Sequence, residues 1–293
     1  MNKILITGAS GSLGHEVAKQ LLQIPQHPPV VVMARNLAKV DDLRQLGAEL
    51  RLGDYEDRAS LDQAFQGIDQ LYFVSGNEIP KRAAQHRHVI AAAQAAGVKH
   101  VVYTSFQRVN DTASSPIAAV ADVHWLTEQL LRDSGLSHSI LRHGLYMDML
   151  PMFLGPNPIA QGRVVLPAGQ GKGAFVARQD LALAGARLLA SRPQQTATLN
   201  FYPQEAWSMG EIAALLAKVG GKPVAYLSPD PAEFKAQLEA IQLPPMVIDM
   251  TLGFAEAIRQ GEFAATSTQL TQFMGRQPLG MQEFLQKTYA PQA

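Results

Sequence analysis

The sequence of 293 residues contains no cysteine, which excludes disulfide bonds, thiolate zinc sites and catalytic thiols. It also lacks an excess of either charge, with 25 Lys and Arg against 25 Asp and Glu, so we expect no basic face for nucleic acid or an anionic membrane. No uninterrupted apolar run could span a bilayer, and the first apolar run begins too early to follow a signal peptide. These absences predict a cytoplasmic protein with no metal site and with neither nucleic acid nor membrane as a partner.

Short apolar runs alternate with helix-compatible segments as far as residue 145. Strands are expected at residues 3–7, 30–34, 49–52, 71–74, 101–104 and 139–141. Helices are expected at 15–22, 37–46, 61–65, 82–96 and 123–134. Strands that are separated by helical crossovers predict an α/β fold, with a Rossmann-type, doubly wound parallel sheet.

After Tyr146 the pattern changes, because Gly and Pro interrupt the alternation. Helices are expected at 181–189, 209–218, 249–259 and 281–289, with a strand that returns to the sheet at 196–202. A glycine-rich turn at 169–173 is expected to lead into a helix capped by Asp180. We therefore predict a nucleotide-binding domain at 1–148 and a smaller, mainly helical substrate lobe at 149–293. The lobe should cover the carboxyl ends of the strands, where ligands bind in such sheets.

Glycines at positions 8, 11 and 14 follow the first expected strand and precede a helix. The pattern G-x-x-G-x-x-G differs by one residue from the common dinucleotide fingerprint. Glycine lets the backbone approach a ligand, and the free N–H groups at a helix start attract phosphate. The segment predicts a dinucleotide site, while the alternative is a purely structural turn between strand and helix.

The end of the second expected strand carries no acidic residue that could bind the adenosine ribose. Arg35 stands there instead, and Lys39 follows one helical turn later. A guanidinium and an ammonium suit the additional 2′-phosphate of NADPH. We therefore predict NADP(H) as the cofactor; the alternative is that both residues are ordinary surface cations.

Several motifs occur in order along the chain. They are Arg35-Asn36-Leu37-Ala38-Lys39, Gly53-Asp54-Tyr55, Tyr103-Thr104-Ser105, His124-Trp125-Leu126-Thr127-Glu128, Leu141-Arg142-His143-Gly144-Leu145-Tyr146 and Arg259-Gln260-Gly261-Glu262-Phe263. With the glycine pattern, they cover nearly the whole chain. The sequence resembles the NmrA-like atypical short-chain dehydrogenases, and within them it is similar to bacterial NADPH:quinone oxidoreductases and triphenylmethane reductases.

The resemblance implies a set of cofactor-binding residues. The pyrophosphate would be bound by Gly8, Ser10, Gly11, Ser12 and Leu13, the 2′-phosphate by Arg35 and Lys39, the adenine edge by Asp54, and the rest of the cofactor by Ser75, Gly76, Asn77, Thr104, His124, Gly144, Leu145 and Tyr146. Other roles remain open for some of them. Asp54 could cap a turn, Ser75 could cap a helix, and Tyr146 could belong to the core.

Typical short-chain dehydrogenases carry a Tyr-x-x-x-Lys pair that donates a proton to the reduced carbonyl. Alignment of Glu128 with the family's helix places Val120 at the Tyr position and His124 at the Lys position. The loss of this pair favours acceptors that spread or neutralise the incoming charge, such as quinones and cationic dyes. His124 could bind the nicotinamide ribose or relay a proton, and the alternative is a packed or capping residue of its helix. Tyr146 could line a flat slot with Phe106, and the alternative is that both belong to the core.

Two functions follow from the resemblance. The first is an NADPH-dependent oxidoreductase that transfers a hydride to a quinone-like aromatic substrate, with His124 and Tyr146 as candidate catalytic residues. The second is a non-catalytic NADP(H)-binding redox sensor, like the regulators for which the group is named. A closed aromatic pocket over the nicotinamide favours the enzyme, and a broad exposed apolar face favours the sensor. The sequence leaves the oligomeric state open, with a homodimer as one candidate.

Overall fold

Seven parallel strands form the central sheet of the protein, whose computed structural model describes residues 2–290. The strands are β1 (Ile4–Ile6), β2 (Val30–Ala34), β3 (Glu49–Leu52), β4 (Gln70–Phe73), β5 (His100–Phe106), β6 (Ser137–His143) and β11 (Ala197–Phe201). Their order is β11-β6-β5-β4-β1-β2-β3, and all neighbours are parallel. Because the chain starts in the middle of the sheet and winds toward both edges, the predicted doubly wound fold is confirmed.

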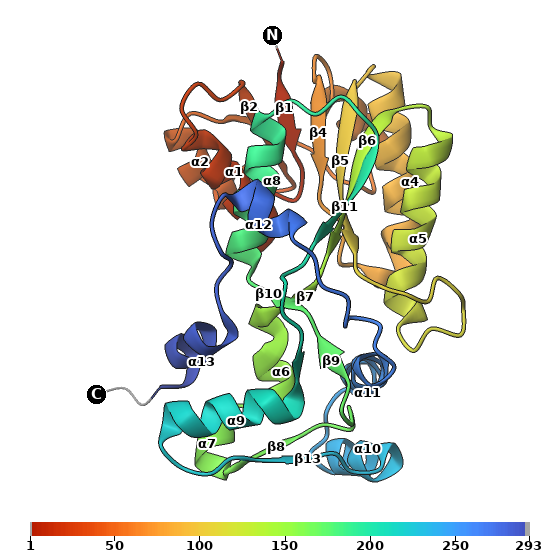
Figure 1. Cartoon of the computed structure of the whole chain (residues 1–293). Coiled ribbons are helices and arrows are strands. Elements are labelled where there is room, and N and C mark those ends of the chain that lie inside the picture. The colour runs from red at the N-terminus through yellow and green to blue at the C-terminus, as the bar shows by residue number, and fades with distance from the viewer. Residues whose placement is uncertain (1, 291–293) are drawn as a thin grey trace.

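Helices cover both faces of this sheet (Figure 1). One face carries α1 (Ser12–Leu22), η1 (Leu37–Val40), α2 (Asp41–Gln45), α8 (Arg178–Ala190) and α12 (Gln269–Met274), and the other carries α3 (Arg58–Ala64), α4 (Ile79–Ala95) and α5 (Ala118–Asp133). Successive strand residues point to opposite faces, so Ile4 and Ile6 pack with α1 and α8 whereas Leu5 packs with α3 and α4. Each such buried side chain contributes about 1.5–3 kcal/mol of transfer free energy.

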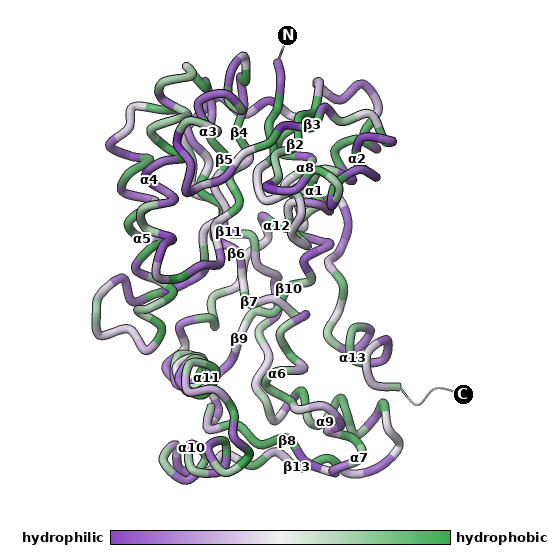
Figure 2. The backbone as a smooth tube through the Cα atoms, turned by 180° about the vertical axis from the view of Figure 1, so that it is seen from behind, coloured by the Kyte–Doolittle hydropathy of each residue, from purple (hydrophilic) through white to green (hydrophobic). Residues whose placement is uncertain are grey.

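A smaller lobe lies at one end of the sheet, and Figures 1 and 2 show it from opposite sides. Its helices are η2 (Met147–Met149), α6 (Leu150–Leu154), α7 (Pro158–Gln161), α9 (Met209–Gly220), α10 (Pro231–Ala240), α11 (Pro245–Arg259) and α13 (Met281–Tyr289). Three short strand pairs join them: β7 (Leu145–Tyr146) with β10 (Phe175–Val176), β8 (Arg163–Val165) with β13 (Ala225–Leu227), and β9 (Lys172–Gly173) with β12 (Trp207–Ser208). The lobe has its own apolar core, which includes Phe153, Phe254 and Phe263. The division at residue 148 stays a prediction.

One local expectation was wrong. Asp180 does not cap α8, because the residue that precedes this helix is Ala177 and Asp180 lies in the first turn. The Asp180 carboxylate is buried and accepts hydrogen bonds of 2.7 Å from the Leu279 amide and the Arg276 guanidinium. It therefore ties the chain before α13 to α8.

Between residues 2 and 290, no helix is long and apolar enough to cross a membrane.

Candidate cofactor and substrate site

A cavity of about 680 Å³ lies where the carboxyl ends of the central strands meet the lobe. Its walls come from the segments that follow β1, β2, β3, β4, β5 and β6, and from α4, α5, α8 and α11. All the residues to which the resemblance gives a cofactor role line this one cavity: Gly8, Ser10, Gly11, Ser12, Leu13, Arg35, Lys39, Asp54, Ser75, Gly76, Asn77, Thr104, His124, Gly144, Leu145 and Tyr146. The structure brings them together, and their individual roles stay predictions.

The turn between β1 and α1 depends on glycine for its shape. Gly8 has a φ of +61°, and a Cβ at this position would lie 3.1 Å from the Val74 Cβ. A Cβ at Gly14 would lie 2.5 Å from the carbonyl oxygen of Gly8, because α1 packs directly on the turn. No side chain among the described residues caps α1, and its first turn has no acidic residue. The first amides of this helix lack intrahelical acceptors, so the turn fits a pyrophosphate.

Tyr55 supports this turn from the side, which the sequence did not reveal. Its hydroxyl lies 2.5 Å from Thr7 Oγ1 and 2.8 Å from the carbonyl oxygen of Val74. The amide of Val74 in turn donates to Thr7 Oγ1 at 3.0 Å. Burial raises the pKa of Tyr55, so its hydroxyl stays protonated. These bonds hold the ends of β1 and β4 in a fixed relation beneath the cavity.

Arg35 and Lys39 lie at the end of the cavity beyond β2. The Arg35 side chain is 63% exposed and forms an ion pair of 3.0 Å with Glu78, which comes directly before α4. Asn36 caps the short helix η1 by accepting the Ala38 amide at 3.0 Å, and this turn carries Lys39. The two cations can therefore face a phosphate at the cavity rim. Arg35 would have to break its ion pair with Glu78 to bind that phosphate.

Asp54 lines the same part of the cavity but also caps a turn. One of its carboxylate oxygens accepts the amide of Glu56 at 3.0 Å, and its own amide donates to Ser60 Oγ at 3.0 Å. The capping role that the sequence left open is thus present. It does not conflict with an adenine contact, because a carboxylate has several acceptor positions.

The loop after β4 is held by side chains from neighbouring elements. The Ser75 amide donates to Thr104 Oγ1 at 2.9 Å, and the Gly76 amide donates to His86 Nε2 at 3.1 Å. Since His86 Nε2 accepts, its Nδ1 carries the proton and donates to Thr127 Oγ1 at 2.7 Å. Burial lowers the pKa of His86 to about 3, which keeps the ring neutral and the bond to Gly76 intact.

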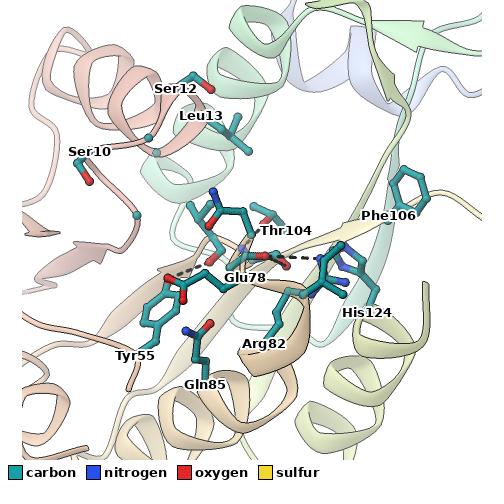
Figure 3. Close-up of a pocket in the computed structure, with 18 of the residues that line it drawn as sticks. Ser10, Ser12, Leu13, Tyr55, Glu78, Arg82, Gln85, Thr104, Phe106 and His124 are labelled. Carbon is teal, nitrogen blue, oxygen red and sulfur yellow. Dashed lines mark hydrogen bonds between the residues drawn. The ribbon is translucent and has the colours of Figure 1, made fainter. Parts of the chain in front are cut away.

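His124 forms the opposite wall of the cavity from the glycine turn, as Figure 3 shows. It is 7% exposed, and its Nδ1 lies 2.9 Å from the hydroxyl of Tyr103. Burial, and after it the charge of Arg82, lower the pKa of His124 well below its usual value. The imidazole is therefore neutral near pH 7, with its ring orientation set by Tyr103.

Tyr146 lines the cavity next to a cation from α8. The guanidinium carbon of Arg178 lies 4.5 Å from the centre of the Tyr146 ring, and the hydroxyl lies 3.4 Å from His143 Nδ1. Burial raises the pKa of Tyr146 to about 12, so the phenol is neutral. Phe106 and Phe254, whose ring centres are 6.3 Å apart, form the apolar end of the cavity.

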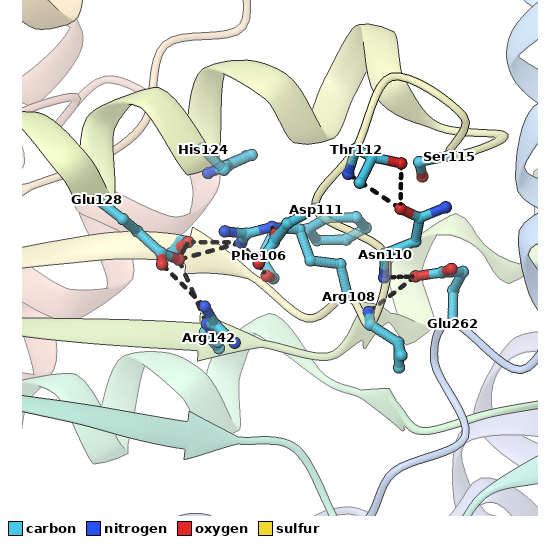
Figure 4. A network of polar contacts seen from close by, with 12 residues as sticks. Phe106, Arg108, Asn110, Asp111, Thr112, Ser115, His124, Glu128, Arg142 and Glu262 are labelled. Atoms are coloured by element: carbon cyan, nitrogen blue, oxygen red, sulfur yellow. Dashed lines mark hydrogen bonds and ion pairs between the residues drawn. The ribbon is translucent and has the colours of Figure 1, made fainter.

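A buried carboxylate holds the end of β5 behind the cavity (Figure 4). Glu128 accepts hydrogen bonds from Ser105 at 2.6 Å, Arg108 at 3.0 Å and Arg142 at 2.9 Å. Burial would raise the pKa of Glu128, but the bonds from Arg142 and Arg108 overcome this and lower it to about 2. The same loop is fixed from the lobe, because Glu262 accepts the amides of Val109 and Asn110 at 2.8 and 2.9 Å.

Several residues of the cavity wall were not predicted from the sequence, among them Tyr55, Glu78, Arg82 and Arg178. Arg82 is 5% exposed, although a charged residue on a helix usually faces solvent. A signal was available for it. Position 82 lies in the first turn of the helix after the loop 75–77, and in this fold such turns border the ligand site.

Comparison with known proteins agrees with this geometry. The NmrA-like family model matches residues 1–285. Quinone oxidoreductase 2 of Escherichia coli is 36% identical over 272 residues, which are 93% of either chain. The structure of an NADPH-dependent quinone oxidoreductase from Escherichia coli with NADPH has a TM-score of 0.86 at 35% identity, over 96% of this chain and 97% of that one. Triphenylmethane reductase of Citrobacter sp. with NADP(H) has a TM-score of 0.86 at 32% identity, over 97% and 99%. The resemblance inferred from the motifs is confirmed, and the chain belongs to the NmrA-like family.

Proposed function

We propose that this NADP(H)-dependent oxidoreductase transfers a hydride to a quinone or a similar conjugated, electron-poor acceptor. One observation carries the proposal: a single cavity combines the glycine turn before α1 with the apolar side chains of Met149, Met250 and Phe254 from the lobe and of Phe106 at the end of β5. The 36% sequence identity to a quinone oxidoreductase, over 93% of either chain, supports the proposal. The bound nicotinamide would supply the hydride, while the protein holds the flat acceptor in place and excludes water.

The proposal includes reduction without a Tyr-x-x-x-Lys pair. Val120 and His124 lie four residues apart on α5, and both line the cavity. Valine cannot donate a proton, so the position that resemblance assigns to the proton-donating Tyr is inert. A quinone tolerates this loss, because its conjugated ring spreads the charge that arrives with the hydride. An aliphatic ketone, whose alkoxide holds the charge on one atom, would be a poor substrate.

We further propose that the protein prefers NADPH to NADH. Arg35 and Lys39 stand at the cavity rim beyond β2, and a guanidinium matches phosphate oxygens in both geometry and charge. No acidic side chain ends β2 to bind the ribose hydroxyls of NADH. Asp54 remains available to contact the adenine from the segment after β3.

His124 is proposed to act as a neutral hydrogen-bonding group. If the Tyr103 hydroxyl donates to Nδ1, then Nε2 carries the proton and can donate to the nicotinamide ribose or to the acceptor; in the other tautomer, Nε2 accepts. Tyr146 is proposed to complete the slot as a neutral phenol beside Arg178. Neither role requires a change of charge at neutral pH.

The first test is oxidation of NADPH with a benzoquinone, a naphthoquinone, a cationic triphenylmethane dye and an aliphatic aldehyde, beside fluorescence titrations of NADPH and NADH. Turnover with quinone but not with aldehyde supports the proposal. Tight NADPH binding without turnover on any acceptor would favour the NADP(H)-binding redox sensor instead. Failure to bind either nucleotide would contradict both functions.

A further inference from the structure

Arg82 is a buried cation that the proposed reaction has not yet used. It lies in the first turns of α4, is 5% exposed and lines the cavity. Its Nη2 donates to the carbonyl oxygen of Val120 at 2.5 Å, and its Nη1 lies 3.5 Å from the carbonyl oxygen of Gly76. Its buried Nε has no partner in the described part of the chain. Among residues 2–290, two neutral carbonyls are thus the hydrogen-bond partners of this guanidinium.

The other buried arginine of this region shows the contrast. Arg108, whose side chain is fully buried, pairs with Glu128 at 3.0 Å and also with Asp111. Across residues 2–290, Arg82 forms no such ion pair with a carboxylate. A buried charge without a counter-ion is costly to the fold, so a cation in this position suggests that an anion arrives with the ligand.

The groups that face Arg82 are neutral. His86 from its own helix, Tyr103 from β5 and His124 from α5 surround it, and its charge helps to keep both imidazoles unprotonated. None of these groups can neutralise the guanidinium. The nearest part of the cavity therefore has a positive potential that an anionic ligand atom would lower.

The position of Arg82 also argues against a role toward the cofactor phosphates. Figure 3 shows Ser12 and Leu13 of the glycine turn on one side of the cavity, with Arg82 and His124 together on the opposite side. Arg35 and Lys39, the proposed partners of the 2′-phosphate, come from the segment after β2 rather than from this wall. Phe106, at the apolar end, lies on the same side as His124, and the two rings are 5.8 Å apart. Arg82 thus borders the place proposed for the acceptor.

We propose that Arg82 binds the acceptor oxygen that becomes anionic during reduction, and that the physiological acceptors are therefore quinones or other conjugated carbonyl compounds rather than cationic dyes. This inference rests on the proposed hydride transfer and names its substrate class. In the step, the acceptor gains a hydride from the reduced nicotinamide: one C–H bond breaks, one bond to hydrogen forms on the acceptor, and the acceptor's carbonyl oxygen keeps the electron pair. Arg82 would stabilise that oxygen until a proton from solvent neutralises it.

Binding of para-nitrophenol tests the assignment without turnover, because its anion absorbs visible light and resembles a hydroquinone anion. The folded wild-type protein should bind the anion in preference, which lowers the pKa of bound para-nitrophenol by about 1 to 3. Arg82→Gln, which keeps a donor for the Val120 carbonyl but no charge, should remove that shift, and Arg82→Lys should restore part of it. Arg87→Gln is the matched control, since Arg87 is exposed on the same helix. Circular dichroism and thermal melting would establish that each variant is folded.

Kinetics separate this inference from the proposed function. With a naphthoquinone, Arg82→Gln should lower kcat by about 100-fold, at the lower end of the loss of an oxyanion donor, while NADPH affinity stays unchanged. If the wild type reduces quinones and Arg82→Gln keeps its kcat, the assignment of Arg82 is wrong and the proposed function stands. If the wild type reduces no acceptor but binds nitrophenolate through Arg82, the anion site at Arg82 is supported and the proposed hydride transfer is contradicted. Absence of nitrophenolate binding, or binding of the neutral phenol in preference, overturns the inference.

Discussion

The ion pair between Arg35 and Glu78 should compete with NADPH binding. The two side chains meet at 3.0 Å at the cavity rim, where they are 63% and 35% exposed. A phosphate that binds Arg35 must displace the Glu78 carboxylate, which can turn toward Lys81, at present 3.8 Å away. Replacement of Glu78 by Gln removes the competitor and leaves the shape of the side chain nearly unchanged.

The size of the effect follows from the exposure of the pair. Exposed ion pairs contribute about 0.2–1 kcal/mol, so Glu78→Gln should tighten NADPH binding by about 1.4- to 5-fold. NADH, which lacks the 2′-phosphate, needs no release of Arg35, and its affinity should change little. High salt screens the exposed pair, so the gain should shrink as ionic strength rises from 0.01 M to 1 M, where the Debye length falls from about 30 Å to about 3 Å.

Fluorescence titration of both nucleotides with the wild type and Glu78→Gln measures this competition. Glu49→Gln is the matched control, because it removes the same charge from a carboxylate that pairs with Lys3 and Arg51 away from the cavity. Equal tightening of NADPH and NADH, or weaker NADPH binding by Glu78→Gln, would refute the competition. If Glu49→Gln tightens NADPH binding as much as Glu78→Gln does, the change in net charge explains the effect and the competition is refuted.

Three further outcomes are expected. Arg35→Ala should weaken NADPH binding by about 10- to 100-fold and leave NADH binding nearly unchanged, which the same titrations detect. Gly14→Ala places a Cβ 2.5 Å from the Gly8 carbonyl oxygen and should cost about 1–3 kcal/mol of stability together with NADPH affinity, whereas Gly280→Ala, with no atom within 4 Å, should cost neither in urea unfolding and titration. Glu128, whose pKa falls from 4.5 to about 2 on folding, should contribute about 3 kcal/mol above pH 4.5 and lose it as the pH falls toward 2. The stability difference between wild type and Glu128→Gln in urea should therefore shrink over that range, and a constant difference would contradict the pKa argument.

The assembly of the site could be predicted because the order and direction of the strands determine which loops lie together. In a doubly wound sheet, the carboxyl ends of parallel strands share one edge, so Gly8, Arg35, Ser75 and Thr104 had to meet once the strand pattern was recognised. Each of these positions can be predicted from the local sequence pattern of one strand and the turn that follows it.

What could not be predicted depends on contacts between distant segments. The helix start at residue 82 could be expected to border the ligand site, but the burial of Arg82 against the Val120 carbonyl could not, because a charged residue on a helix usually faces solvent. Asp180 was assigned to a cap from its position alone, whereas its partners Arg276 and Leu279 lie almost 100 residues later. The pairing of β8 with β13 joins two short runs whose hydrophobic pattern is too brief to identify either as a strand.

The order of the strands has a consequence for the synthesis of the protein. The edge strand β11 pairs with β6, and α8 packs against α1, yet both β11 and α8 are made after the first segments of the lobe. A nascent chain that ends at residue 148 would expose the unpaired edge of β6 and the apolar side of α1. α12, which packs on the same face, emerges later still. The nucleotide-binding half should therefore complete its fold only near the end of translation, when most of the lobe has already left the ribosome.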